Sequence, residues 1–435
     1  MKRVPPSERT RKAIQELLHQ GTSEAEPRSE LVRLAVQRIV EEALEAEVRD
    51  RLGREYYEHG AEGRGHRNGY RTGRLKTSEG AVEYAVPQVC DVPGGFASRL
   101  RDQVAGRTEA LEQLGIEMYA RGLSTRDIEA AFRGEDGRSL LTRSAVSDLT
   151  EALWKEYEEF ATRDLSELEP LYLFVDGVTE KLHAGAKREA VLAAWAILWS
   201  GKKVLLHVAP GTKESTECVV DFFQDMKRRG LRDPILVNTD GAPGLIAAVD
   251  RCFPTSLRQR CLAHRVRNIV SKLPEAACVE VKQAALAAYQ APSVAMAEKL
   301  RDDLVERYQA EYPSAVACFL DDFDACVAQL RCPPAHRRII RTTNLLERLF
   351  EEERRRTRAA HTIIGERAVM KLMYASLVRA SDSWRGVTIT DFERRQLEAL
   401  REQLISKHQE KNRPLAKSAS KTEPTPLRIP SKQRT

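Results

Sequence analysis

The sequence predicts an α/β protein in which a mixed β-sheet is preceded and followed by helical regions. Between residues 169 and 261, short apolar runs typical of strands alternate with segments of helical periodicity. On both sides of this stretch, apolar residues recur at the spacing of amphipathic helices. The chain of 435 residues is long enough for two or three domains, each with its own core.

The composition is that of an ordinary intracellular protein with a mildly basic balance. There are 70 Lys and Arg against 64 Asp and Glu, so net charge alone argues only weakly for an anionic partner. No apolar run approaches the ~20 residues needed to cross a bilayer, and the N-terminus lacks the apolar stretch of a secretory signal. The eight cysteines are irregularly spaced, which favours reduced thiols in the cytoplasm.

The N-terminal part predicts a helix, a basic segment and a strand. Apolar spacing indicates an amphipathic helix over residues 29–52, and "GAVEYAVPQV" alternates as a strand does. Between them, residues 59–76 are rich in glycine and arginine and are interpreted as a loop or extended arm. This arm would contact DNA phosphates or a minor groove, although a solvated loop is the alternative. Its candidate DNA-binding residues are Arg64, Arg67, Arg71 and Arg74, with Tyr70 among them.

Residues 108–160 predict three helices in the order of a helix-turn-helix. The first two are interrupted at Gly122, and Ser124 or Thr125 is a suitable N-cap for the second. The third helix would begin near Thr142 or Ser144. A small helical bundle gives the same pattern. If the motif binds DNA, Arg143, Ser144 and Ser147 would begin the recognition helix; otherwise they form the polar first turn of a bundle helix.

The α/β stretch contains four expected strands and two expected helices. The strands are "LYLFVDG", "AVLAAWAILWS", "KVLLHVA" and "PILVNTDG", and the helices are "STECVVDFFQDMKRRG" and "GLIAAVDRCF". Helical periodicity continues from Cys261 to Leu330 and from Thr343 to Leu404. Residues 406–435 hold eight Lys or Arg, two Glu and four prolines, a composition that predicts a disordered basic tail.

Two strands end in an aspartate followed by glycine, at Asp176 and Asp240. If these strands are neighbours, the two carboxylates lie side by side and repel each other. Bound Mg²⁺ or Mn²⁺ would remove that conflict, because both prefer hard oxygen ligands. The alternative for each residue is a tight turn, since Asp bonds its own backbone and Gly accepts positive φ.

A third carboxylate would come from the helix predicted in "RTTNLLERLFEEERRRTR". Its apolar stripe is Leu345, Leu346, Leu349 and Phe350, and its other face carries Glu347, Glu351, Arg354 and Arg358. Glu347 would approach the metals, with Arg354 and Arg358 near a phosphate backbone. Two alternatives stay open: Glu347 closes a capping box with Asn344, or Glu351, Glu352 or Glu353 is the ligand instead.

These motifs, taken in order, resemble those of the bacterial mutator-type insertion-sequence transposases. The residues are Asp176-Gly, Thr-Asp240-Gly, "RCLAH" with Cys261 and His264, and "TTNLLE" ending in Glu347. The upstream "RNGYRTG" and "MYARGLSTRDIEAAF" are also similar to that family, so the likeness extends from Leu31 to Ser383.

The resemblance implies an RNase H-like mixed-sheet catalytic core with an all-helical insertion, preceded by an α-helical DNA-binding region. It implies a catalytic and metal-binding triad of Asp176, Asp240 and Glu347 holding two Mg²⁺ or Mn²⁺ ions. The enzyme would cut DNA at terminal inverted repeats and transfer the freed 3′-hydroxyl to target DNA. Alternatives are a catalytically silent DNA-binding descendant, or a nuclease or resolvase on the same fold.

The residue patterns and the family resemblance together predict the domain organisation. A helical region (1–58) precedes the basic arm with short strands (59–105) and the helix-turn-helix-like region (106–165). The first part of the core (166–260) is followed by the helical insertion (261–340), the last part of the core (341–405) and the tail (406–435).

Two features need separate interpretation. The family usually has an asparagine three positions after its glutamate, where this chain has Phe350, which puts one polar DNA contact in doubt; Arg354 matches the family's basic residue. Cys261 and His264 could be half of a zinc site, but no second pair stands at suitable spacing, so a structural or DNA-proximal role is favoured.

The expected partners are DNA, as inverted repeats and as target, and further copies of the chain. Two element ends must be joined together, which predicts a homodimer or larger assembly on DNA. No membrane and no small-molecule substrate are expected, and the predicted location is the bacterial cytoplasm in association with the nucleoid.

Overall fold

A computed structural model of the chain describes residues 4–19, 27–56, 58, 65–134, 137–180, 189–211, 216–347, 350–351, 354, 365–382 and 384–412. The chain divides into two compact units. The first comprises Met1–Glu169, Leu173–Arg232 and Thr343–Val387, and the second comprises Pro170–Tyr172, Asp233–Thr342 and Thr388–Thr435. None of the helices in the described ranges is long and apolar enough to span a membrane.

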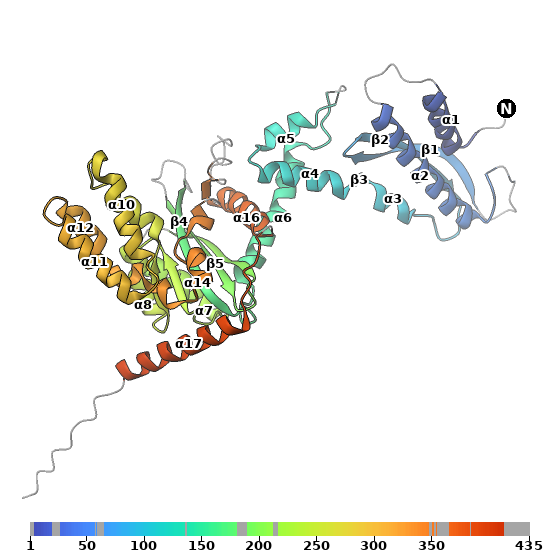
Figure 1. Ribbon diagram of the computed structural model, residues 1–435. Helices are drawn as coiled ribbons and strands as arrows, with labels where there is room; N and C mark the ends of the chain where they lie inside the picture. The colour runs from blue at the N-terminus through green and yellow to red at the C-terminus, as the bar shows by residue number, and fades with distance from the viewer. Residues whose placement is uncertain are drawn as a thin grey trace, which may run out of the picture. The chain divides into compact units, whose positions relative to one another are not determined.

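The first unit begins with two helices and a three-stranded sheet (Figure 1). Its elements are α1 (Pro6–His19), α2 (Pro27–Leu52), β1 (His66–Thr77), β2 (Gly80–Cys90), α3 (Arg99–Val104) and β3 (Gly106–Arg107). The strand order is β2-β1-β3. Helix α2, which was predicted, packs Val40 and Leu44 on Leu75, Val82 and Tyr84 of the sheet, because burying this apolar stripe stabilises both elements.

The glycine-rich basic segment is largely a strand, which differs from the predicted loop or extended arm. Strand β1 pairs antiparallel with β2 from His66 to Thr77. Gly73 shows why glycine is needed inside this strand, since a Cβ atom there would lie 2.4 Å from the ring of Tyr84. The absent side chain makes room for an aromatic ring from the neighbouring strand. Residues 59–64 of the predicted arm lie outside the described residues.

Three helices around one apolar core follow, as the sequence predicted. They are α4 (Glu109–Ala120), α5 (Thr125–Ala131) and α6 (Arg143–Thr162). Gly122 makes the turn between α4 and α5 with a φ of +93°. Ser124 caps α5 and forms a capping box with Asp127, and Thr142 caps α6. Leu111, Ile128, Leu141 and Val146 are fully buried where the three helices meet.

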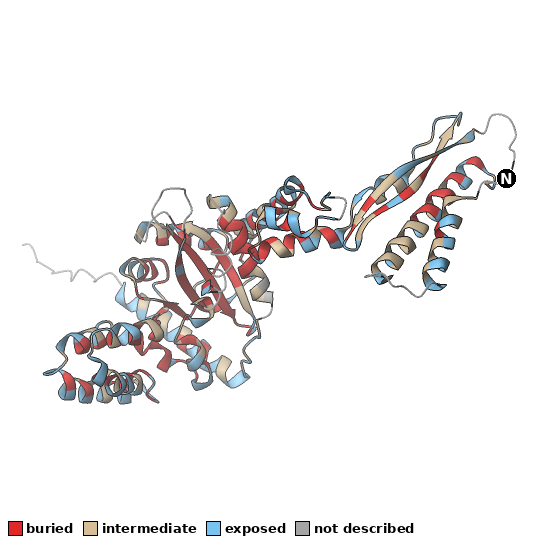
Figure 2. Ribbon diagram, turned by 90° about the horizontal axis from the view of Figure 1, so that it is seen from above, coloured by how far each residue is buried: buried red, intermediate tan, exposed pale blue. Residues whose placement is uncertain are grey.

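A five-stranded sheet forms the mixed α/β part of the protein, which confirms the predicted fold class at this level. Its strands are β4 (Pro170–Glu180), β5 (Glu189–Leu198), β6 (Lys203–Gly211), β7 (Leu236–Thr239) and β8 (Leu257–Arg260), in the order β6-β5-β4-β7-β8. Strand β5 pairs antiparallel with β6, whereas β7 pairs parallel with β8. Figure 2 shows these strands as mostly buried. Helices α7 (Thr216–Arg228) and α8 (Pro243–Cys252) alternate with the strands.

Strand β8 was not predicted from the sequence. Its residues, Leu-Arg-Gln-Arg, read as polar, yet Gln259 is fully buried and Arg260 is only 9% exposed. Neighbouring polar groups satisfy these side chains, as described below. A search for apolar runs cannot find such a strand.

The segment after β8 is helical throughout its regular elements, as predicted. These are α9 (Leu262–Val270), α10 (Glu275–Tyr289), α11 (Val294–Tyr308), α12 (Pro313–Leu320), α13 (Phe323–Cys326), the 3₁₀ helix η1 (Ala328–Arg331) and α14 (Pro334–Ile340). Tyr289, Phe319 and Phe323 form the aromatic centre of its apolar core. We call residues 261–340 the helical insertion, which is the name that the family resemblance implies for this segment.

The C-terminal part contains a helical turn at residues 344–347 and two long helices, α16 (Glu366–Asp382) and α17 (Asp391–Lys411). Thr390 caps α17 in a capping box with Glu393. Helix α17 continues to Lys411, so the tail predicted from residue 406 is wrong in its starting point. Its residues 413–435 lie outside the described residues.

Candidate active site

Asp176 lies within a buried strand and not in a turn. Strand β4 continues past Asp176 and Gly177 to Glu180, so the alternative of a tight Asp-Gly turn is wrong here. The preceding residues 171–175 are at most 1% exposed and Asp176 itself is 4% exposed. Its Oδ1 atom accepts a hydrogen bond of 2.9 Å from the Gly177 N–H. A carboxylate is costly to bury at a site that serves packing alone, which marks Asp176 as a functional candidate.

Asp240 does lie in a turn, directly after β7. Its Oδ1 atom accepts a hydrogen bond of 2.9 Å from the backbone N–H of Ala242, the residue that precedes α8. Gly241 has a φ of +88°, which glycine adopts without strain. The turn alternative is therefore correct for this aspartate. The same turn fixes the carboxylate at the end of a sheet strand, the place where α/β active sites form.

Glu347 lies in the first turn of a helix that begins after Thr343. The carbonyl of Thr343 accepts hydrogen bonds from the N–H groups of Leu346 and Glu347, at 2.9 and 3.2 Å. Asn344 is already helical. It is therefore not the N-cap, and the capping-box alternative is wrong.

The helix directs its apolar residues inward and leaves Glu347 half-buried. Leu346 is fully buried and Phe350 is 2% exposed. Glu351, one of the competing candidates, is exposed, whereas Glu352 and Glu353 lie outside the described residues. The burial of Phe350 gives a physical reason for an apolar residue at the position where the family has asparagine, since the side chain belongs to the core. Arg354 is half-buried, and Arg358 lies outside the described residues.

The three carboxylates supply the hard oxygen donors that Mg²⁺ or Mn²⁺ prefers. Asp176 and Glu347 belong to the first unit, and Asp240 belongs to the second. Among the residues that the structure describes, no three His, Cys, Asp or Glu side chains form a group that could hold a metal ion. The carboxylate oxygens are therefore of the right chemical type for these ions, whereas the convergence of all three carboxylates stays a prediction.

Cys261 has a structural position between the sheet and the helical insertion. It is fully buried, its N–H donates to the Thr239 carbonyl at 2.7 Å, and it is the N-cap residue of α9. His264, one turn into that helix, is half-buried. The structural or DNA-proximal role expected for this pair stays a prediction.

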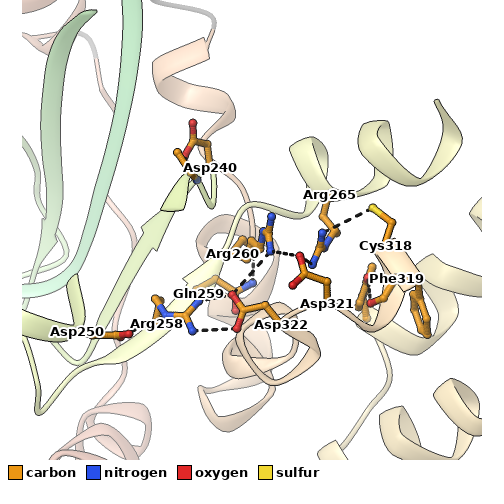
Figure 3. Close-up of polar contacts among 12 residues, drawn as sticks. Asp240, Asp250, Arg258, Gln259, Arg260, Arg265, Cys318, Phe319, Asp321 and Asp322 are labelled. Atoms are coloured by element: carbon orange, nitrogen blue, oxygen red, sulfur yellow. Dashed lines mark hydrogen bonds and ion pairs between the residues drawn. The ribbon is translucent and has the colours of Figure 1, made fainter. Parts of the chain in front are cut away.

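Sequence reasoning missed a pair of buried arginines that bind one carboxylate of the helical insertion. Arg260 and Arg265 both donate to the carboxylate of Asp321, at 3.0 and 2.8 Å (Figure 3). Arg265 is 2% exposed. Arginines in an unassigned segment are normally interpreted as surface residues. The pair Asp321-Asp322 between two apolar helices was the one available signal of a buried partner.

The candidate DNA-binding arginines of β1 differ in their surroundings. Arg67 lies 3.7 Å from Glu45 with its side chain 15% exposed, and Arg74 lies 4.0 Å from Glu83. Arg71 is exposed. Arg64 lies outside the described residues. Arg71 is therefore the described arginine of this set that is most accessible to a phosphate.

The three candidates at the start of α6 are all exposed. Arg143 donates from its Nε to Glu129 of α5 at 2.9 Å, while 57% of its side chain stays exposed. Ser144 and Ser147 lie on the same first turns. This surface is accessible in the way that a recognition helix requires.

Comparison with known proteins places these features in one family. Residues 8–386 match the family described as "Transposase, Mutator family". The chain is 30% identical over 378 residues to the transposase for insertion sequence element ISRM5 of Rhizobium meliloti (strain 1021), covering 85% of this chain and 94% of that protein. It is 31% identical to the transposase for IS6120 of Mycolicibacterium smegmatis, over 62% of this chain and 84% of that one.

A third relative is the transposase for IS256 in transposon Tn4001 of Staphylococcus aureus, 29% identical over 73% of this chain and 82% of that protein. The family match spans both units and includes Asp176, Asp240 and Glu347. The chain belongs to the mutator family of insertion-sequence transposases.

Proposed function

We propose that this transposase cleaves and joins DNA at a site formed by Asp176, Asp240 and Glu347 on an RNase H-like core. One observation carries the proposal. The N–H of Ile235, just before β7, donates to the carbonyl of Leu171 in β4 at 2.9 Å. Asp176 follows Leu171 by five residues, and Asp240 follows Ile235 by five residues. If the two strands continue in parallel from this pairing, both aspartates reach the same level of the sheet.

The order of strands supports an RNase H-like core. Strand β4, the first in sequence, is central in the order β6-β5-β4-β7-β8, and its neighbour β7 leads into Asp240. The sheet is mixed, with an antiparallel pair β5–β6 and a parallel pair β7–β8. The helical insertion separates this sheet from the helix of Glu347 in sequence, which is the organisation that the family resemblance implies.

Each acidic residue would have a distinct task. Asp176 is held in a buried strand and provides a fixed ligand, while the bond from the Ala242 N–H orients Asp240. Glu347 would complete the donor set from its helix. Bound divalent ions, once present, would neutralise charge on the phosphodiester and make water or a 3′-hydroxyl more nucleophilic. Because the described residues hold no group of three such ligands, the proposal requires the three carboxylates to converge when metal and DNA bind.

The partners follow from the same proposal. The exposed start of α6 and Arg71 of β1 would contact the terminal inverted repeats, and the acidic site would act on the repeat end and on target DNA. Two ends must be processed together, so we expect a dimer or larger assembly on DNA.

The test uses the full chain, a labelled inverted-repeat end and Mg²⁺. Asp176→Asn should bind the repeat in a gel shift with unchanged affinity and should not cut it. Asp221→Asn, which changes an exposed aspartate of α7, is the matched control and should cut normally. Isothermal calorimetry should show Mn²⁺ binding to the wild type and its weakening in Asp176→Asn and Glu347→Gln.

A pre-cut repeat end separates joining from cutting. Joining of this end to target DNA supports transposition, whereas cutting without joining would indicate a nuclease or resolvase. Cutting by Asp176→Asn at the wild-type rate would overturn the proposed site.

A further inference from the structure

The end of β8 is tied to the helical insertion by ion pairs. Arg258 makes two hydrogen bonds to the carboxylate of Asp322, one of them 2.9 Å long, and Arg260 Nη1 donates to Asp321 Oδ2 at 3.0 Å (Figure 3). Both aspartates lie in the short connection between α12 and α13. Asp322 has a φ of +59°, a left-handed conformation that aspartate adopts more readily than most residues other than glycine. The insertion therefore holds the strand through charged groups on this short connection.

The guanidinium of Arg260 lies against the turn that carries Asp240. A Cβ atom built on Gly241 would lie 2.2 Å from Arg260 Nε, 2.8 Å from Cζ and 2.9 Å from Cδ. The Arg260 side chain is 10% exposed. Its Nε atom is buried and has no hydrogen-bond partner among the described residues. The stem and head of Arg260 thus fill the space beside Gly241.

The strand register puts this arginine at the level of the candidate active site. Thr239, the last residue of β7, is the partner of Arg260 in the parallel ladder with β8. Asp240 is the next residue, and its carboxylate accepts the Ala242 N–H across Gly241. A shift of the Arg260 side chain would therefore open space directly under this turn.

We propose that Arg260 is a positioning residue for Asp240, and that Asp321 of the helical insertion holds Arg260 in place. The inference rests on the proposed function, because positioning matters to the reaction only if Asp240 takes part in it. It assigns the insertion a role in the reaction, since one of its carboxylates sets the shape of the Asp240 turn. Arg260 touches no reacting group itself.

Arg265 provides an internal comparison. It is more deeply buried than Arg260 and donates to the same Asp321 oxygen at 2.8 Å. The Arg265 and Arg260 guanidiniums hold the pKa of Asp321 below its usual range. Arg265 lies in α9, and its Nη1 also donates to the Sγ atom of Cys318 in the insertion at 3.7 Å. Loss of either arginine removes a positively charged partner of the Asp321 carboxylate. Of the two arginines, Arg260 is the one that lies against Gly241.

The experiment compares Arg260→Met with Arg265→Met in the full-length protein. Hydrogen exchange followed by mass spectrometry reports on the segment from Asp240 to Asp250, and single-turnover cleavage of a repeat end reports on the reaction. We expect Arg260→Met to speed exchange in that segment about tenfold or more and to slow cleavage by a similar factor. The DNA dissociation constant should stay within about twofold. Arg265→Met should lower the melting temperature. It should leave the exchange rate of the Asp240–Asp250 segment and the cleavage rate near their wild-type values.

Two further variants complete the design. Arg260→Lys keeps the charge and most of the stem, so it should recover part of the cleavage rate; it also carries the test if Arg260→Met does not fold. Asp321→Asn should speed exchange at Asp240–Asp250 as Arg260→Met does. Unchanged exchange in the Arg260 variants, or equal effects of Arg260→Met and Arg265→Met, would overturn the inference. If the wild type does not cut DNA, the proposed function fails, while the exchange comparison still decides whether Arg260 positions the turn.

Discussion

Arg260 Nε occupies the space that a side chain on residue 241 would need, 2.2 Å from the position of a Cβ atom on Gly241. Two independent restrictions therefore act on Gly241. Its φ of +88° is unfavourable for any other residue, and the buried arginine beside it is fixed by Asp321. Both the backbone conformation of the turn and the packing of Arg260 therefore require glycine at position 241.

Replacement of Gly241 by alanine should stop DNA cleavage while DNA binding continues. The backbone strain alone should cost about 1–2 kcal/mol of stability, and the contact with Arg260 adds to it. Gly95→Ala is the matched control, because Gly95 also has a positive φ (+75°) but nothing lies within 4 Å of its Cβ position. Thermal unfolding and single-turnover cleavage should show a larger defect for Gly241→Ala. Equal melting temperatures for the two variants would show that Arg260 moves aside freely.

Glu347→Gln should lower the cleavage rate by at least about a hundredfold, as expected for an essential catalytic group. The substitution keeps the size of the side chain and removes the charge that a metal ligand needs. Glu351→Gln changes the same chemical group one turn further along the helix, where the side chain is exposed. It should cut DNA at nearly the wild-type rate. The reverse result, with Glu351 essential, would move the third ligand to that residue.

Ser147→Glu should weaken binding to inverted-repeat DNA about tenfold in a gel shift at fixed salt concentration, because it places a negative charge near phosphates. Ser147 is exposed near the start of α6. Ala152→Glu adds the same charge to an exposed position later in that helix and should have little effect. Equal binding by both variants would argue for a plain bundle helix.

His207 should make the protein less stable in mild acid. It is 6% exposed and stacks on Phe222 with ring centroids 4.8 Å apart. Burial, followed by the charge of Arg229, lowers its pKa from 6.5 to about 4. The unfolded chain therefore binds a proton that the folded chain excludes between pH 6.5 and pH 4. Stability falls as the pH falls through this window, on the order of 3 kcal/mol in total.

Urea unfolding at pH 7 and pH 5 measures this effect. His207→Gln should show a smaller loss of stability between the two pH values than the wild type shows. His66→Gln alters a histidine whose side chain is 58% exposed and should keep the wild-type pH dependence. If His207→Gln loses as much stability between pH 7 and pH 5 as the wild type does, a group other than His207 causes the pH dependence.

Elements with regular apolar patterns could be predicted from the sequence, and buried polar elements could not. Helix α2, the three helices α4 to α6 and strand β5 follow directly from apolar periodicity. Strand β8 was missed because Gln259 and Arg260 look like surface residues, and their burial depends on partners 61 and 70 residues further along the chain. Strand β1 was interpreted as a loop because of its glycines, of which Gly73 makes room for the ring of Tyr84 and Gly69 has a φ of +78° where the pairing with β2 is irregular.

The candidate site was also predicted only in part. The Asp-Gly pattern looked the same at residues 176 and 240, but the first pair lies inside a strand and the second forms a turn. Sequence spacing allowed Asn344 to be the N-cap of the following helix, whereas the hydrogen bonds assign that place to Thr343. Local sequence leaves such choices open, because the ends of strands and helices depend on tertiary packing.

The side chain of Gln259 bonds to the backbone of the helical insertion, to the N–H of Gln329 at 2.8 Å and the carbonyl of Cys326 at 3.3 Å. Strand β8 is the last in its sheet, and an uncovered outermost strand invites pairing with other molecules. A shortened version of the protein from which residues 262–340 were deleted would lose this cover and leave Arg258 and Arg260 without their acidic partners. Such a truncation should precipitate or self-associate, so engineering for smaller size would have to begin elsewhere in the chain.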